Sequence, residues 1–213
     1  YTFNDNLRKD AQYYKLDITN KSGSNWNNAY FSFFIDSDIG DGYNDKVGSD
    51  STLGLVYTYN GNTSDTAFGN TPPAMGYKLI SSPNGVTLSS CTPFYNNNSV
   101  PTPPSCNTDP NLTSEFYNMQ KGLDKCGSPF TFNGQPRNFV YNGNPETGSG
   151  WNSPVNGDVR MTMNIGPFNL APNQSATFIV AALVAQGTNN LNSVTKLKQY
   201  AAIIPISVQT ISS

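Results

Sequence analysis

The residues most able to carry chemistry form an acidic loop from residue 36 to residue 50. Five aspartates, one asparagine and three glycines fall within these 15 residues, which read DSDIGDGYNDKVGSD. Calcium takes six to eight oxygen ligands, and closely spaced aspartates followed by glycine supply both the oxygens and the turns that wrap a chain around an ion. We therefore predict a calcium site whose candidate ligands are Asp36, Asp38, Asp41, Asn44, Asp45, Asp50 and the backbone carbonyl of Gly40.

The loop does not follow the EF-hand pattern. Its fifth position is Gly40 and its twelfth is Val47, where an EF-hand places a bidentate glutamate. It looks more like the aspartate-rich calcium loops of extracellular repeat modules. Two alternatives stay open: a solvated turn in which Asp and Gly serve Asx turns, and a catalytic carboxylate pair.

Composition excludes several classes of function. The chain has no histidine, so Ser-His-Asp and Cys-His catalysis and His-ligated zinc are ruled out. The 12 Lys and Arg residues are spread along the chain, which argues against nucleic-acid binding. No run of 18 apolar residues predicts a membrane span. We predict that the protein is not an enzyme, because its two glutamates, Glu115 and Glu146, sit in irregular or polar stretches.

The three cysteines predict an oxidising compartment. Cys91 and Cys106 flank a stretch rich in Asn, Ser and Pro that has no hydrophobic period. A disulfide across a loop of about 15 residues would contribute about 3 kcal/mol, so we predict this pair. The alternatives are a Cys106–Cys126 pair and three reduced cysteines.

The elements that must position the loop are mostly strands. Alternating or apolar runs predict strands at residues 12–19, 29–35, 53–59, 75–80, 159–165 and 176–186. Short helices are predicted at 113–120 and 190–200, with irregular chain at 36–51 and 90–112 and a corner at 166–175. Many strands without βαβ alternation indicate an all-β fold, an antiparallel β-sandwich or jelly roll with long loops, formed by residues 1–213 as a single domain.

The end of the chain forms an uncharged tail. Residues 202–213 read AIIPISVQTISS, which alternates and favours β structure. Such a strand is a pairing hazard when its edge is exposed. We expect it to close its own sandwich or, alternatively, to pair with a neighbouring subunit, which would make the protein a self-assembling filament subunit.

The aromatic residues have two interpretations. Trp26 and Trp151 could stack against sugar rings beside Asn and Asp hydrogen-bonding groups, which predicts polysaccharide as a partner. Strand aromatics more often belong to the core.

An ordered series of segments resembles a module of large secreted proteins from Bacteroidetes and Ignavibacteria that are exported by the type IX secretion system. The segments are YKLDITNKSG (14–23), FIDSDIGD (34–41), NDKVGSD (44–50), PPAMGY (72–77), GSGW (148–151), DVRM (158–161), GPF with LAP (166–172), AQG (185–187) and LNSVTKLK (191–198). The resemblance covers most of residues 13–200. It implies an extracellular or cell-surface location and a β-sandwich architecture.

This resemblance gives two short motifs a meaning. Ser51, in Asp50-Ser51-Thr52, and Thr66, in Asp65-Thr66-Ala67, match the short O-glycan acceptor pattern associated with such secreted proteins. The first residues, from Tyr1 on, do not look like a translation start or a signal peptide, so we expect a mature or excised segment of a larger product.

The sequence thus predicts a secreted structural or adhesive cell-surface module with a calcium-stabilised acidic loop. Its expected partners are further copies of itself or other cell-surface proteins. The alternative is a carbohydrate-binding accessory module of a secreted multidomain protein.

Overall fold

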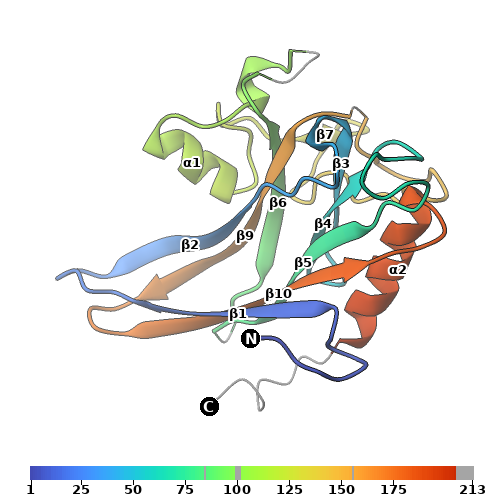
Figure 1. Ribbon diagram of the computed structural model, residues 1–213. Coiled ribbons are helices and arrows are strands. Elements are labelled where there is room, and N and C mark those ends of the chain that lie inside the picture. The colour runs from blue at the N-terminus through green and yellow to red at the C-terminus, as the bar shows by residue number, and fades with distance from the viewer. Residues whose placement is uncertain (84, 99–101, 155, 205–213) are drawn as a thin grey trace.

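Two antiparallel sheets lie face to face in the computed structural model (Figure 1). The structure describes residues 1–83, 85–98, 102–154 and 156–204. One sheet has five strands in the order β1 (Ala11–Thr19), β10 (Ser175–Ala185), β5 (Ala74–Ser81), β4 (Leu55–Asn60) and β3 (Asp45–Asp50). The other has three, in the order β2 (Trp26–Ile35), β9 (Val159–Leu170) and β6 (Leu88–Tyr95). The predicted all-β sandwich is confirmed.

The central strand β10 explains how one sheet can serve two cores. Its side chains alternate between opposite faces, as in any strand. Phe178 and Val180 belong to the cluster between the two sheets, whereas Ile179, Ala181 and Leu183 belong to a second cluster on the outer face of the five-stranded sheet. A strand buried on both faces reads as a continuous apolar run, which the sequence of β10 shows.

Helix α2 (Asn190–Ile203) covers that outer face, where it contacts β4, β5 and β10 (Figure 1). It buries Val194, Leu197 and Ala201, and it begins after Asn189, whose side chain accepts a hydrogen bond from the Asn192 N–H. The smaller elements are 3-10 helices η1 (Gly42–Asn44) and η2 (Ser105–Asn107) and the short pair β7 (Thr131–Phe132) and β8 (Gln135–Pro136). Within the described ranges, no helix has both the length and the apolar character that crossing a membrane requires.

Helix α1 (Thr113–Gln120) lies on the outer face of the three-stranded sheet, and one buried amide holds it there. Asn164 of β9 is fully buried. Its Nδ2 donates to the Met119 carbonyl at 3.0 Å and to Ser90 Oγ at 2.9 Å, while its Oδ1 accepts from Ser32 Oγ at 2.7 Å. A single side chain therefore joins α1 to all three strands of this sheet.

Two long segments predicted to be irregular contain strands, and residues 166–170 of the predicted corner continue β9. Residues 45–50 form β3, although their composition is that of a loop, because they pair with β4 from Asp45↔Asn60 to Asp50↔Leu55. Residues 88–95 form β6 despite Pro93. Proline has no N–H to donate to a neighbouring strand, and an edge strand such as β6 tolerates this because only one of its edges is paired in the sheet. Of the predicted tail, Ala202 and Ile203 end α2, Ile204 is buried, and residues 205–213 lie outside the described chain.

The predicted Cys91–Cys106 disulfide is wrong. Cys91 lies on β6 with its side chain buried in the core between the sheets, and burial raises its thiol pKa to about 12. The disulfide joins Cys106 and Cys126, whose Cα atoms are 5.4 Å apart. The Lys125 N–H donates to the Cys106 carbonyl at 3.2 Å, so the chain after α1 is held beside η2.

Candidate functional site

The acidic loop contains one carboxyl group that is removed from solvent. Asp45, the first residue of β3, is 1% exposed. Its Oδ2 accepts a hydrogen bond from the Ile39 N–H at 3.0 Å, and its Oδ1 has no hydrogen-bond partner among the described residues. The pKa of Asp45 is raised to about 7, mainly by burial; the Ile39 hydrogen bond opposes this, and the negative charges of Asp38, Asp41 and Asp65 add to it. A buried oxygen without a partner needs either a proton or a cation.

Asp65 lies near Asp45 as well, although the sequence does not indicate this. It lies in the loop between β4 and β5, and its Oδ2 accepts from the Asp41 N–H at 3.0 Å and from Asn60 Nδ2 at 3.2 Å. The backbone hydrogen bond from Asp41 is the main cause that lowers its pKa, so Asp65 stays charged. Its only sequence signal was the short motif Asp65-Thr66-Ala67, whose interpretation concerned Thr66.

Gly40 allows the loop to approach Asp65. The φ angle of Gly40 is +77°, and a Cβ atom placed there would lie 2.2 Å from Asp65 Oδ1. Any side chain at this position would therefore collide with the carboxylate. Gly40 therefore lies directly beside Asp65, and its carbonyl as a calcium ligand stays a prediction.

Asn44 and Asp41 complete the turn before β3. Asp41 caps η1, because its Oδ1 accepts from the Tyr43 N–H at 3.1 Å. Asn44 is 7% exposed, and its buried Oδ1 lacks a hydrogen-bond partner in the described part of the chain. An amide oxygen and a carboxylate oxygen on consecutive residues, Asn44 and Asp45, are thus both unsatisfied.

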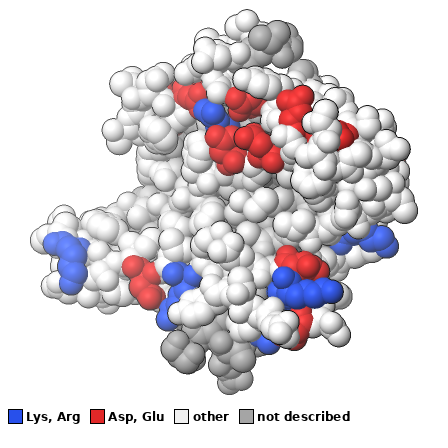
Figure 2. Space-filling model, viewed as in Figure 1, with Lys and Arg blue, Asp and Glu red and all other residues white. Residues whose placement is uncertain are grey.

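Asp36 belongs to a different cluster, which is built around Arg160 of β9. The Arg160 guanidinium lies 3.0 Å from Asp36, 2.8 Å from Asp109 and 3.7 Å from Asp158. Burial opposes the charge on Arg160, but the Asp109 hydrogen bond and the three carboxylates outweigh it and raise its pKa. Acidic groups gather on this upper part of the molecule (Figure 2). The Arg160 guanidinium already pairs with the Asp36 carboxylate, which makes Asp36 a poor calcium ligand.

Asp38 lies between the two clusters. Burial raises its pKa, and the charges of Asp36 and Asp158 add to that effect, whereas Arg160 opposes it. Asp38 also contributes to the raised pKa of Asp45. We therefore group Asp38 with Asp41, Asp45 and Asp65 and refer to these four residues as the Asp45 cluster.

Asp50 does not join the Asp45 cluster. It stands at the other end of β3, where it lies 3.2 Å from Lys198 and accepts a hydrogen bond from Thr52 Oγ1 at 2.7 Å. Burial opposes its charge, but the Thr52 hydrogen bond and Lys198 outweigh this and lower its pKa. The sequence predicts residues 36–50 as one loop. In the structure, residues 45–50 are the strand β3, so Asp45 and Asp50 lie at its opposite ends.

The Asp45 cluster supplies oxygen ligands but no assembled cage. In residues 1–83, 85–98, 102–154 and 156–204, no three Asp, Glu or Cys side chains are placed so that they could hold a metal ion as they stand. Carboxylates of Asp38, Asp41, Asp45 and Asp65 would have to draw together around a cation. Such a rearrangement is compatible with the flexible geometry of calcium coordination.

The candidate glycan contacts have different surroundings. Trp151 stacks on Phe132 with ring centroids 5.2 Å apart and an interplanar angle of 11°, so one of its faces is already covered. Trp26 is half-buried and packs against the core between the sheets. Ser51 and Thr66 are exposed in turns, as glycan acceptors would have to be.

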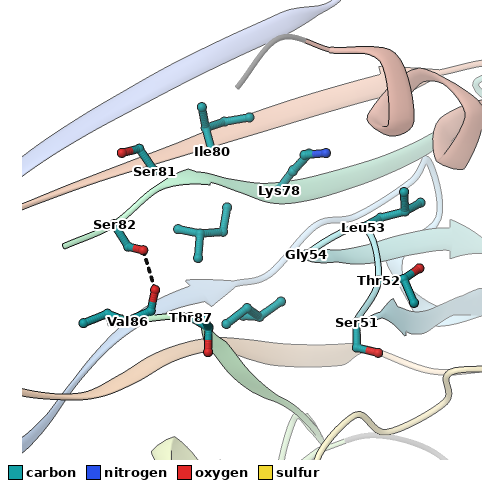
Figure 3. A pocket seen from close by; sticks show the side chains of 12 residues that line it. Ser51, Thr52, Leu53, Gly54, Lys78, Ile80, Ser81, Ser82, Val86 and Thr87 are labelled. Atoms are coloured by element: carbon teal, nitrogen blue, oxygen red, sulfur yellow. Dashed lines mark hydrogen bonds between the residues drawn. The ribbon is translucent and has the colours of Figure 1, made fainter. Parts of the chain in front are cut away.

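A separate pocket of about 480 Å³ lies between the β3–β4 turn, β5 and the chain after β5 (Figure 3). Hydroxyl groups such as Ser51 and Thr87 line it together with apolar side chains such as Val86. Its charged lining residue is Lys78, which rises from β5 on the side of α2 and donates to the Ala201 carbonyl at 2.6 Å. The described lining therefore brings no acid and base together.

Comparisons with protein-family models, with curated proteins and with solved structures found no match. The resemblance to secreted type IX modules accordingly stays a prediction.

Proposed function

We propose that this protein is a secreted structural or adhesive module of the cell surface whose acidic loop is closed by calcium. The observation that carries the calcium part is the buried Oδ1 of Asp45, which has no hydrogen-bond partner within the described chain and lies near three further carboxylates. A divalent cation would satisfy that oxygen and offset the mutual repulsion of the cluster.

The proposed ligands differ from those that the sequence alone favoured. Asp38, Asp41, Asp45 and Asp65 offer carboxylate oxygens, and Asn44 offers a buried amide oxygen. Asp36 and Asp50 are left out because Arg160 and Lys198 already neutralise them. Water completes the six to eight oxygens that calcium requires.

Two features support an extracellular location. The Cys106–Cys126 disulfide suits an oxidising compartment. Millimolar affinities are typical of calcium sites in extracellular modules, and a cluster that is not preassembled fits that weak class.

Calorimetry with calcium and with magnesium tests the proposal directly. We expect calcium to bind and to raise the melting temperature. At a calcium concentration of about 100 times the dissociation constant, the free energy of unfolding should rise by about 3 kcal/mol. Asp45→Asn should abolish the response. Asp50→Asn is the matched control, because Asp50 lies at the far end of the same strand and should leave calcium binding unchanged. The calcium site is refuted if the wild type shows neither heat nor a melting shift.

A further inference from the structure

The edge strands on the two sides of the sandwich differ in how far other segments cover them. On the side formed by β3 and β6, other segments cover both edge strands: the Ser49 N–H donates to the Tyr141 carbonyl at 3.1 Å, and the Cys91 N–H donates to the Asn138 carbonyl at 2.9 Å. On the side formed by β1 and β2, which we call the open side, the Tyr13 N–H donates to the Tyr1 carbonyl at 2.8 Å at the start of β1. Beyond that point the described residues place no backbone partner on either edge.

The edge of β2 lacks the usual protection against pairing. Natural edge strands are shielded by charges, proline or bulges. β2 has no charged residue and no proline, and its register shifts are confined to the segment between Trp26 and Phe31. From Phe31 to Ile35 it pairs regularly with β9, so its other edge is regular as well. β1, in contrast, carries Lys15 and Asp17.

The open side is also apolar. Phe33 of β2 lies 5.6 Å from Tyr14 of β1, measured between ring centroids, so aromatic rings fill the gap between the two edges. Phe34 points to the outer face of the sheet, where it is 51% exposed beside Phe94. A strand added to β2 would find apolar neighbours and backbone groups that no described residue pairs.

The chain itself contains a segment that matches this edge. Residues 205–213 read PISVQTISS and carry no charged side chain, and Ile206 and Val208 share the alternate spacing of one strand face. Nine residues span about 30 Å when extended, which is close to the length of the ten-residue β2. The segment follows Ile204, which is buried in the cluster on the outer face of the five-stranded sheet, the cluster that also contains Ala11 and Tyr13 of β1.

We propose that residues 205–213 of one copy add as a strand to the free edge of β2 in a second copy. The donor segment and the acceptor edge are different parts of the chain, so the contact is head to tail and repeats into rings or filaments. This inference deepens the structural role proposed above by naming the partner, and it does not depend on calcium.

Single substitutions in the full-length chain test donor and acceptor separately. Val208→Lys places a charge in the donor, and Phe34→Lys places one at the acceptor edge. Phe116→Lys is the matched control, because Phe116 of α1 is 48% exposed, close to the 51% of Phe34. Sedimentation and electron microscopy should show oligomers for the wild type and for Phe116→Lys, and monomers for the other two variants.

Mixing the two monomeric variants gives the decisive result. The Phe34→Lys chain keeps an intact donor and the Val208→Lys chain keeps an intact acceptor, so the mixture should form dimers and nothing longer. A mixture that stays monomeric overturns the proposal, as does a monomeric wild type. A Val208→Lys chain that melts far below the monomeric Phe34→Lys chain would place the segment within its own subunit and would also overturn the proposal, because neither variant gains stability from association. These outcomes are independent of the calcium titration, so failure here leaves the proposed calcium site standing.

Discussion

Replacing Asp45 with asparagine isolates the effect of one buried carboxyl on the pH dependence of folding. Burial raises its pKa from 3.8 to about 7. Because the pKa in the folded chain lies above the unfolded value, the folded chain holds the proton more tightly. In calcium-free solution this stabilisation is fully present below about pH 4 and is lost as the pH rises through about 7.

The expected magnitude follows from the size of the shift. A difference of about 3 pKa units corresponds to about 4 kcal/mol. For a domain of this size, 1 kcal/mol moves the melting temperature by about 2–4 °C, so the effect is on the order of 10 °C. The asparagine amide can accept the Ile39 hydrogen bond but leaves its own N–H₂ unpaired, which costs about 1–3 kcal/mol at every pH. The pH dependence, not the absolute stability, is therefore the quantity to compare.

The assay is urea unfolding of wild type and Asp45→Asn between about pH 4 and about pH 8, in the presence of a chelator. The difference between their free energies of unfolding should change by about 4 kcal/mol in favour of the variant as the pH rises. Asp50→Asn is the control whose difference from the wild type should stay nearly constant in this range, because the lowered pKa of Asp50 gives a stabilisation that is lost only below about pH 4. A constant difference between wild type and Asp45→Asn would refute the reasoning.

Three other predictions concern the disulfide, the buried amide of Asn164 and the partly buried guanidinium of Arg160. Reduction of the Cys106–Cys126 bond, whose cysteines are 20 residues apart, should lower the free energy of unfolding in urea by about 3 kcal/mol. The buried Cys91 should react with a thiol reagent only on unfolding, and rapid labelling of the native chain would contradict its burial. Asn164→Ala should cost about 3 kcal/mol in thermal or urea unfolding and weaken the protection of α1 in hydrogen exchange, whereas unchanged exchange there would show that α1 is held by other contacts. Arg160→Met should cost about 2 kcal/mol at low salt and less at about 1 M salt, and a loss that ignores salt would argue for packing as its cause.

The strands with clear patterns could be predicted, and the two weakly patterned strands could not. β9 and β10 have long alternating or apolar runs, and α2 has apolar residues at helical spacing after an asparagine cap, so their existence was predictable. β3 has the composition of a turn and is a strand only because β4 lies beside it. Tertiary context decided that case, as it commonly does for β structure.

The candidate site was predictable only in its local part. The sequence places Asp38, Asp41 and Asp45 within eight residues, but it cannot show that the loop after β4 brings Asp65 against Gly40. Nor could it show that Arg160, more than a hundred residues away, binds Asp36. The disulfide failed for a related reason: Cys91 was assumed to border a loop, whereas the strand β6 carries it into the core.

Both sheets join the beginning of the chain to its end. β1 pairs along its whole length with β10, and β2 pairs with β9, so each early strand waits for a partner more than 120 residues later in the sequence. Neither sheet can close before its late strand, β10 or β9, has left the ribosome, and contacts of such long range make folding slow. The nascent chain therefore exposes its aromatic β2 strand until residues 161–170 of β9 are available, and a holding chaperone would protect it during that interval.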